Sequence, residues 1–307
     1  MDDKLLFVQF PHPGGEHRPD NGLIKAWNKN CHKRKFMKRA VRYLTDAKDK
    51  KANMGDMVFW GEWEPESSVV REIDGPNDHG PRFIYEPYYV VPKSYNGLQN
   101  TDPFVFGDQF HYTVCLQRDF PQLRHLSKGS VILFGSCKDH AFALDTVFVV
   151  GDHPPMDHTR ANYGTVLDGA ISQEYKEVTI SPLYGEPIAE SKSCSRENKS
   201  CTSADARETW RLYFGASYDK PVQDMYSFFP CQPYEVKSKG FARPKIDLPQ
   251  INPKKCSGVK YTGAKYQDRL SPDEIKSLWD KVAGKVKNNG LALGVYAEMP
   301  ERCIANK

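Results

Sequence analysis

The sequence of 307 residues lacks the short motifs that mark the common nucleotide-dependent and hydrolytic enzymes. It contains no P-loop, no Rossmann glycine fingerprint, no GxSxG nucleophile elbow and no zinc-deaminase pattern. Nucleotide-powered motors, dinucleotide-dependent redox enzymes and serine hydrolases therefore have no support. We predict a protein that uses no nucleotide cofactor and no cofactor of another kind.

Long apolar runs are missing as well. No segment approaches the roughly 20 apolar residues that a membrane helix requires, and the N-terminal MDDKLLFVQF lacks the basic and apolar regions of a signal peptide. The eight cysteines show neither a CxxC pair nor dense spacing, which is typical of reduced thiols in the cytoplasm. We expect a cytoplasmic protein without membrane contact. Whether Cys194 and Cys201 pair across their polar loop stays open.

Strand-like segments dominate the first half of the chain. Each is rich in aromatic or β-branched residues and is bounded by Gly, Pro, Asp or Asn. These segments are residues 4–10, 55–61, 82–91, 104–116, 129–135 and 142–152. The pattern predicts an α+β fold in which an antiparallel sheet or a small β-barrel is flanked by helices.

Two helices are predicted. Residues 22–47 carry apolar side chains at spacings of three and four, although the middle of the segment is mostly basic. The second helix covers residues 272–289, where Ser271 is an N-cap, Glu274 completes a capping box and Gly290 ends the helix.

The turn after the first strand holds several residues that can carry chemistry. The segment FPHPGGEHRPD contains His12, Glu16, His17 and Asp20. A carboxylate beside an imidazole is a recurrent acid–base pair, because each group tunes the pKa of the other. These four residues are the predicted catalytic groups, and a polar surface turn is the alternative. No metal is predicted, because His-x4-His with one Glu is not a known ligand spacing.

A basic segment follows this turn. Residues 25–42 contain eight Lys or Arg and no acid, and aromatic residues are interleaved with them. Such a segment is able to bind a phosphate backbone, and a solvated charged face is the alternative. The predicted nucleic-acid contacts are His32, Lys33, Arg34, Lys35, Lys38, Arg39 and Arg42.

The segment WGEWEPE at the end of a predicted strand suggests a pocket for a base. Trp60 and Trp63 would stack on the base, and Glu62 would accept a hydrogen bond from its exocyclic amine. An acidic hairpin with Trp60 in the core is the alternative.

Two resemblances extend this interpretation. The segments GDMVFWG and GSVILFG, each ahead of further β-runs, resemble the small β-barrels of the PUA-like group, which includes EVE and ASCH domains. That resemblance implies binding of modified or flipped bases. The segments FPHPGGEH, NCHKRKF, GDMVFWGEWEP and FGASY…DMYSFFPC are similar to antiviral-defence proteins, a group that includes DNA glycosylases acting on glucosylated hydroxymethylcytosine.

We therefore predict a DNA-acting antiviral enzyme that flips out a modified base and hydrolyses its N-glycosidic bond. Glu16 or Asp20 would activate water or stabilise an oxocarbenium-like state, while His12 or His17 assists the leaving group. A non-catalytic reader of modified bases and a metal-dependent nuclease are the alternatives.

The polar composition of residues 186–208 predicts an exposed insertion or linker. Residues 1–185 would then form the base-binding core, including the basic helix. Residues 209–307 would form a C-terminal α+β segment packed on that core.

Overall fold

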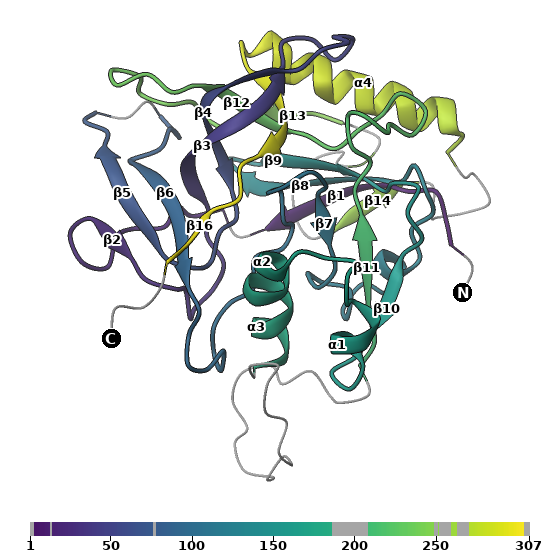
Figure 1. Ribbon diagram of the computed structural model, residues 1–307. Coiled ribbons are helices and arrows are strands. Elements are labelled where there is room, and N and C mark those ends of the chain that lie inside the picture. Colours follow the sequence, from purple (N-terminus) through teal and green to yellow (C-terminus); the bar gives the residue numbers. More distant parts are fainter. Residues whose placement is uncertain are drawn as a thin grey trace.

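A computed structural model describes residues 3–12, 14–75, 78–185, 208–248, 251, 259–262 and 270–303. The chain is mostly β, and its longest helix, α4, lies along one side of the sheets, away from the short helices α1–α3 (Figure 1). The predicted insertion at residues 186–208 lies outside the described residues except for Glu208.

Four strands form a closed ring, which is the barrel of this fold. They are β3 (Lys35–Leu44), β4 (Asn53–Gly61), β12 (Phe229–Pro233) and β15 (Ala292–Ala297). All four pairings in the ring, β3–β4, β4–β12, β12–β15 and β15–β3, are antiparallel. The prediction of a small β-barrel is therefore confirmed, and strands from both halves of the chain build it.

The predicted helix over residues 22–47 is wrong. Residues 35–44 form β3, which pairs with β4 from Lys35–Gly61 to Tyr43–Asn53. The basic middle of this segment interrupts the apolar stripe of the predicted helix, so a helix here would bury few apolar side chains. Phe36 and Val41 are instead buried in hydrophobic clusters, while the cations between them, Lys38 and Arg39, are partly exposed.

Further strands extend the barrel sheet and form two other sheets. β2 (Ile24–Lys25), β5 (Ser67–Glu72), β6 (Phe83–Val90) and β16 (Glu301–Cys303) continue outward from β3. A five-stranded sheet has the order β13 (Lys245–Ile246), β9 (Ala141–Val149), β8 (Val131–Lys138), β1 (Phe7–His12), β14 (Lys260–Thr262). A third sheet holds β10 (Met156–His158), β11 (Trp210–Phe214) and β7 (His111–Tyr112).

Most of the predicted strands are present. β1, β4, β6, β8 and β9 each overlap a predicted segment closely, whereas the segment 104–116 contributes only β7 and isolated bridges. β1 and β8 run parallel, so the sheets are mixed rather than purely antiparallel.

The helices are few, so the expected flanking helices are only partly present. α4 (Pro272–Asn288) matches its prediction, and both hydrogen bonds of the capping box are formed. α1 (Tyr163–Val166), η1 (Pro121–Arg124), α2 (Gln173–Tyr175) and α3 (Ser181–Tyr184) are short, and a π-helical turn, η2 (Lys176–Ile180), joins α2 to α3. Among the described helices, none combines the length and hydrophobicity needed to cross a bilayer.

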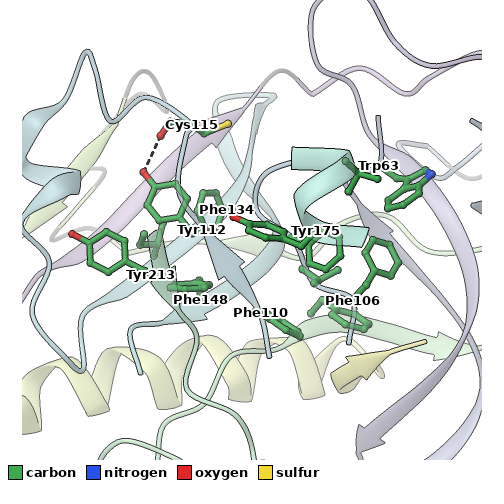
Figure 2. Packing of buried hydrophobic residues seen from close by; sticks show 14 of the residues in the cluster. Trp63, Phe106, Phe110, Tyr112, Cys115, Phe134, Phe148, Tyr175 and Tyr213 are labelled. Atoms are coloured by element: carbon green, nitrogen blue, oxygen red, sulfur yellow. Dashed lines mark hydrogen bonds between the residues drawn. The ribbon is translucent and has the colours of Figure 1, made fainter. Parts of the chain in front are cut away.

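One aromatic cluster connects the barrel to the five-stranded sheet. Trp63 beyond β4, Phe134 on β8 and Tyr112 on β7 are all fully or almost fully buried in it. Figure 2 shows these rings together, with the Tyr112 hydroxyl donating to the Cys115 carbonyl at 2.8 Å. Burial of so many rings fixes the relative positions of the two sheets, between which the candidate site lies.

The cysteines differ from the expectation in one respect. Cys31, Cys115, Cys231 and Cys303 are free thiols, as expected, but Cys137 takes part in a disulfide. Cys194 and Cys201 lie outside the described residues.

Candidate functional site

Three segments that the sequence analysis singled out converge beside the barrel. The turn after β1 runs along the residues before β3, because the His17 amide donates to the Arg34 carbonyl and the Arg34 amide donates to the Gly15 carbonyl, both at 2.9 Å. β3 pairs with β4 as far as Gly61, so the acidic segment after β4 lies beside Arg34. The opening turn, the basic segment and the WGEWE segment therefore form one site.

Two carboxylates lie at the middle of this site. Arg34 Nη1 donates to Glu62 Oε2 at 2.7 Å, and Asn28 Nδ2 donates to Glu64 Oε2 at 2.5 Å. The other oxygen of each carboxylate faces His32, whose Nδ1 lies 3.0 Å from Glu62 Oε1 and 2.9 Å from Glu64 Oε1. Each carboxylate is thus anchored through one oxygen and directed at the same imidazole through the other.

Both carboxylates are ionised at neutral pH although they are buried. Burial alone would raise their pKa values, but the surrounding imidazoles, and Arg34 beside Glu62, outweigh burial and lower the pKa of both groups. Burial likewise opposes protonation of His32, but Glu62 and Glu64 raise its pKa well above the usual value. The centre therefore holds two carboxylates around one imidazolium.

Two further imidazoles face the carboxylates in neutral form. Burial lowers the pKa of His12 to about 3, and it also lowers the pKa of His17. His12 Nδ1 lies 3.4 Å from Glu62 Oε2, and His17 Nε2 lies 3.7 Å from Glu64 Oε2. Within the described parts of the chain, neither nitrogen has a hydrogen-bond partner. We call the set Glu62, Glu64, His12, His17 and His32 the buried centre.

A second layer of charged groups holds this centre in place. Arg34 Nε donates to Asp145 Oδ2 at 2.7 Å, so its guanidinium bridges β9 and the segment after β4. Arg243 donates to Ser136 Oγ and to the Gly14 carbonyl, both at 2.7 Å, and its Nη1 lies 3.4 Å from Asp145 Oδ1. The sequence analysis missed Asp145 and Arg243 because each is a single charged residue far from the three segments.

Asp102 was also missed. Its carboxylate accepts the backbone amides of Thr113, Val114 and Cys115 at 2.7–3.0 Å. Burial nevertheless raises its pKa to about 7, against the effect of these amides. The residue before it, Thr101, accepts the Glu64 amide at 3.0 Å, so this loop helps to position the carboxylate pair.

The four predicted catalytic residues divide into two groups. His12 and His17 belong to the buried centre. Glu16 instead accepts the amides of Arg82 and Phe83 at 2.8 and 3.1 Å, which ties the turn to the start of β6. Asp20 is exposed and pairs with Lys25 at 2.8 Å. In this structure the last two acids stabilise turns and do not contact Glu62.

The two tryptophans of the predicted base pocket lie in the core. Trp60 is 3% exposed and Trp63 is 0% exposed, and they belong to different hydrophobic clusters. Arg243 covers the ring of Trp60 at 5.1 Å, and the indole of Trp63 donates to the Glu66 carbonyl. Neither ring offers a free face for a base, which corrects the stacking prediction. The third predicted pocket residue, Glu62, is in the buried centre.

The predicted nucleic-acid contacts do not lie on one face of the protein. Most of them lie on a strand, β3, whose successive side chains point to opposite faces of the sheet. His32 and Arg34 belong to the site, and Lys35 is fully buried. The remaining cations on β3 pair with acids at the surface, as Lys38–Asp56, Arg39–Glu298 and Arg42–Asp108. Lys33 is half-buried, and its side chain lies next to Gly15 of the opening turn.

Cations from other segments join Lys33 around the opening turn. Arg82 is exposed, and its amide binds the Glu16 carboxylate. Lys138 lies close enough to Arg243 that burial and this guanidinium together lower the pKa of Lys138. We call Lys33, Arg82 and Lys138 the basic rim. These cations lie around the opening turn, where they would attract an anionic group.

Two overlapping sets of side chains in the site have the composition and spacing of metal ligands. One is His32, Glu62 and Glu64, and the other is His12, Glu62 and Cys115. In each set the ligand atoms lie within 4.8 Å of one another. No local spacing of residues indicated these sets, because the ligands of the first come from two separate segments and those of the second from three.

Comparisons of the chain with protein-family models, with curated proteins and with solved structures found no match.

Proposed function

We propose that the protein is a hydrolase that cleaves the N-glycosidic bond of a modified base in DNA, as part of antiviral defence. One observation carries this proposal: two buried, ionised carboxylates face two neutral imidazoles with unpartnered nitrogens, and both imidazoles come from the opening turn that the basic rim surrounds. The catalytic carboxylate of the proposal is Glu62, in place of Glu16 and Asp20.

The charges of the centre suit glycosidic bond cleavage. The transition state has the character of an oxocarbenium ion, so a fixed negative charge in a site of low dielectric constant stabilises it. Glu62 and Glu64 supply that charge. Neutral His12, with its Nδ1 directed toward Glu62, would accept a hydrogen bond from the attacking water and orient it, while the Glu62 carboxylate would accept the proton of that water.

The depth of the centre favours a substrate that leaves the helical stack. The side chains of Glu62 and Glu64 are 1% and 0% exposed, and only His32, at 20%, gives a partial opening to solvent. An enzyme that acts on a base in such a site must extrude the nucleotide from the duplex. The basic rim would then hold the flanking phosphates.

A metal-dependent nuclease is the second candidate. The two sets of potential metal ligands around Glu62 favour it, because metal-activated water and a positively charged clamp are the usual means of phosphodiester cleavage.

The products separate these functions. Purified protein is incubated with phage DNA that carries glucosylated hydroxymethylcytosine and with unmodified DNA of the same sequence. Release of free modified base, with abasic sites left in the strand, supports the glycosylase. Strand breaks without free base support the nuclease instead. Selective binding of the modified DNA without any product overturns both enzymatic proposals and leaves the reader.

A further inference from the structure

We propose that His32, Glu62 and Glu64 bind one divalent transition-metal ion, such as Mn²⁺ or Zn²⁺. His32 Nδ1 lies 3.0 and 2.9 Å from the Oε1 atoms of the two glutamates. Two ligand atoms that bind an ion at about 2.1 Å and at right angles lie about 3.0 Å apart. The observed spacings therefore match two edges of an octahedral coordination shell.

The remaining oxygens of both carboxylates are held by neighbouring side chains. Arg34 Nη1 binds Glu62 Oε2, and Asn28 Nδ2 binds Glu64 Oε2. Such outer hydrogen bonds orient ligands around metal ions and strengthen binding. The Oε1 atoms are both directed at His32 Nδ1, and Glu62 Oε1 also accepts the Asp102 amide in a long contact of 3.4 Å.

Unpartnered nitrogens provide an independent indication of a ligand. His12 is 7% exposed and His17 is 1% exposed, yet His12 Nδ1 and His17 Nε2 have no hydrogen-bond partner among the described residues. Buried polar atoms are seldom left in this state, because each one costs free energy. His12 Nδ1 lies 3.4 Å from Glu62 Oε2 and His17 Nε2 lies 3.7 Å from Glu64 Oε2, so both nitrogens border the carboxylate pair, and water bound to the ion would supply their missing partner.

The balance of charge also favours a cation. Glu62, Glu64 and Asp145 place three carboxylates in the buried region, against the two guanidinium groups of Arg34 and Arg243, so their charge is balanced only while a third positive charge lies at His32, either a proton or a bound cation. A single N–H of His32 cannot donate well to both carboxylates at once, whereas a divalent ion can bind both.

The mixed donor set determines the class of ion. Imidazole nitrogen favours Zn²⁺ or Mn²⁺ over Ca²⁺, which prefers oxygen ligands alone. The Cys115 thiol donates to the Asp102 carbonyl at 3.3 Å and would have to give up this hydrogen bond and its proton to bind an ion, so the set that contains Cys115 is the weaker ligand group. The inference rests on the second candidate function, the metal-dependent nuclease, because a bound ion would neutralise the negative charge of Glu62 and Glu64 that the glycosylase proposal uses; the test below measures the ion alone and not the products.

Metal binding is measured on the full chain after chelator treatment and removal of the chelator. Mn²⁺ is titrated and followed by electron paramagnetic resonance, because the signal of the free ion falls on binding, and Zn²⁺ is titrated by calorimetry. The variants are His32→Ala and Glu64→Gln, and Glu16→Gln is the control carboxylate from the same region. Circular dichroism shows whether each variant keeps the fold.

We expect one site per chain in the wild-type protein and in Glu16→Gln, with affinity reduced roughly tenfold or more in the folded ligand variants. If neither ion binds the wild-type protein, the proposal is overturned. Equal binding by all the folded variants would also overturn it, because the ion would then lie elsewhere. If both ligand variants fail to fold, a wild-type crystal soaked in Mn²⁺ must show an anomalous peak beside His32 Nδ1, and a peak elsewhere or none contradicts the proposal.

Discussion

At the scale of single residues, burial decides what each charged side chain does. Arg34 and Arg42 lie only eight positions apart in one basic segment of the chain. Arg34 is 1% exposed and binds Glu62 and Asp145, whereas Arg42 is 36% exposed and pairs with the largely exposed Asp108. The sequence shows both as members of one basic run, so it gives no means of telling a site residue from a surface cation.

This difference predicts unequal costs of substitution. Arg34→Met leaves two buried carboxylates without their cation, which should lower the free energy of unfolding by about 3–5 kcal/mol. Arg42→Met removes a surface ion pair with Asp108 and should cost less than about 1 kcal/mol. Urea unfolding of the two variants checks the prediction. Equal costs would show that Arg34 is not the buried partner of both acids.

Lys35 gives a prediction for pH. Its Nζ donates to the Pro65 carbonyl at 2.7 Å, and burial lowers its pKa from 10.5 to about 7. The unfolded chain therefore binds a proton that the folded chain does not bind between these pH values. The free energy of unfolding of the wild-type protein should therefore rise as the pH increases from about 7 toward 10.5. Below pH 7 Lys35 is protonated in both states, so it makes no contribution to the pH dependence there.

Lys35→Met removes this titration. The difference in unfolding free energy between the wild-type protein and Lys35→Met should shift in favour of the wild type as the pH rises from 7 to 9. Lys38→Met serves as the control, because the Lys38 side chain on β3 is partly exposed and pairs with Asp56 at the surface. A difference for Lys35→Met that stays constant across this range would contradict the lowered pKa.

At the scale of elements, the sequence predicted correctly the element whose determinants lie within its own residues, and it failed for an element that depends on distant strands. α4 was predicted to within a residue because its cap, capping box and apolar stripe all lie within the helix itself. β3 was mistaken for a helix because its state depends on pairing with β4 and β15, which no local pattern reports. Strand pairing overrode the weak helical spacing of the apolar residues.

Closure of the barrel leads to a prediction about two glycines. A Cβ at Gly294 on β15 would lie 2.2 Å from the ring of Phe229 on β12, whereas a Cβ at Gly284 in α4 would meet no atom within 4 Å. Gly294→Ala should therefore destabilise the protein by about 1–3 kcal/mol through overpacking. Gly284→Ala should stabilise it by up to about 1 kcal/mol, because alanine favours a helix.

Thermal unfolding of the two variants, followed by circular dichroism, gives the comparison. A melting temperature for Gly294→Ala that equals or exceeds that of the wild type would show that β12 and β15 do not pack as closely as described.

At the scale of the whole molecule, the site is built from segments far apart in the chain. The sequence predicted that the opening turn and the WGEWE segment carry chemistry, and His12, His17 and Glu62 do meet in one centre. It did not show that Asp145 on β9 and Arg243 beyond β12 complete the surroundings. Such contacts follow from the packing of two sheets and leave no pattern in the local sequence.

The central claim is that the buried centre around Glu62, rather than the more accessible acid Glu16, performs the chemistry. The most direct measurement is the rate of base release from glucosylated phage DNA by the wild-type protein, Glu62→Gln and Glu16→Gln, with folding checked by circular dichroism. We predict that Glu62→Gln lowers the rate by about a hundredfold or more, while Glu16→Gln keeps most of it. Near-normal base release by Glu62→Gln, or a loss confined to Glu16→Gln, would contradict the claim.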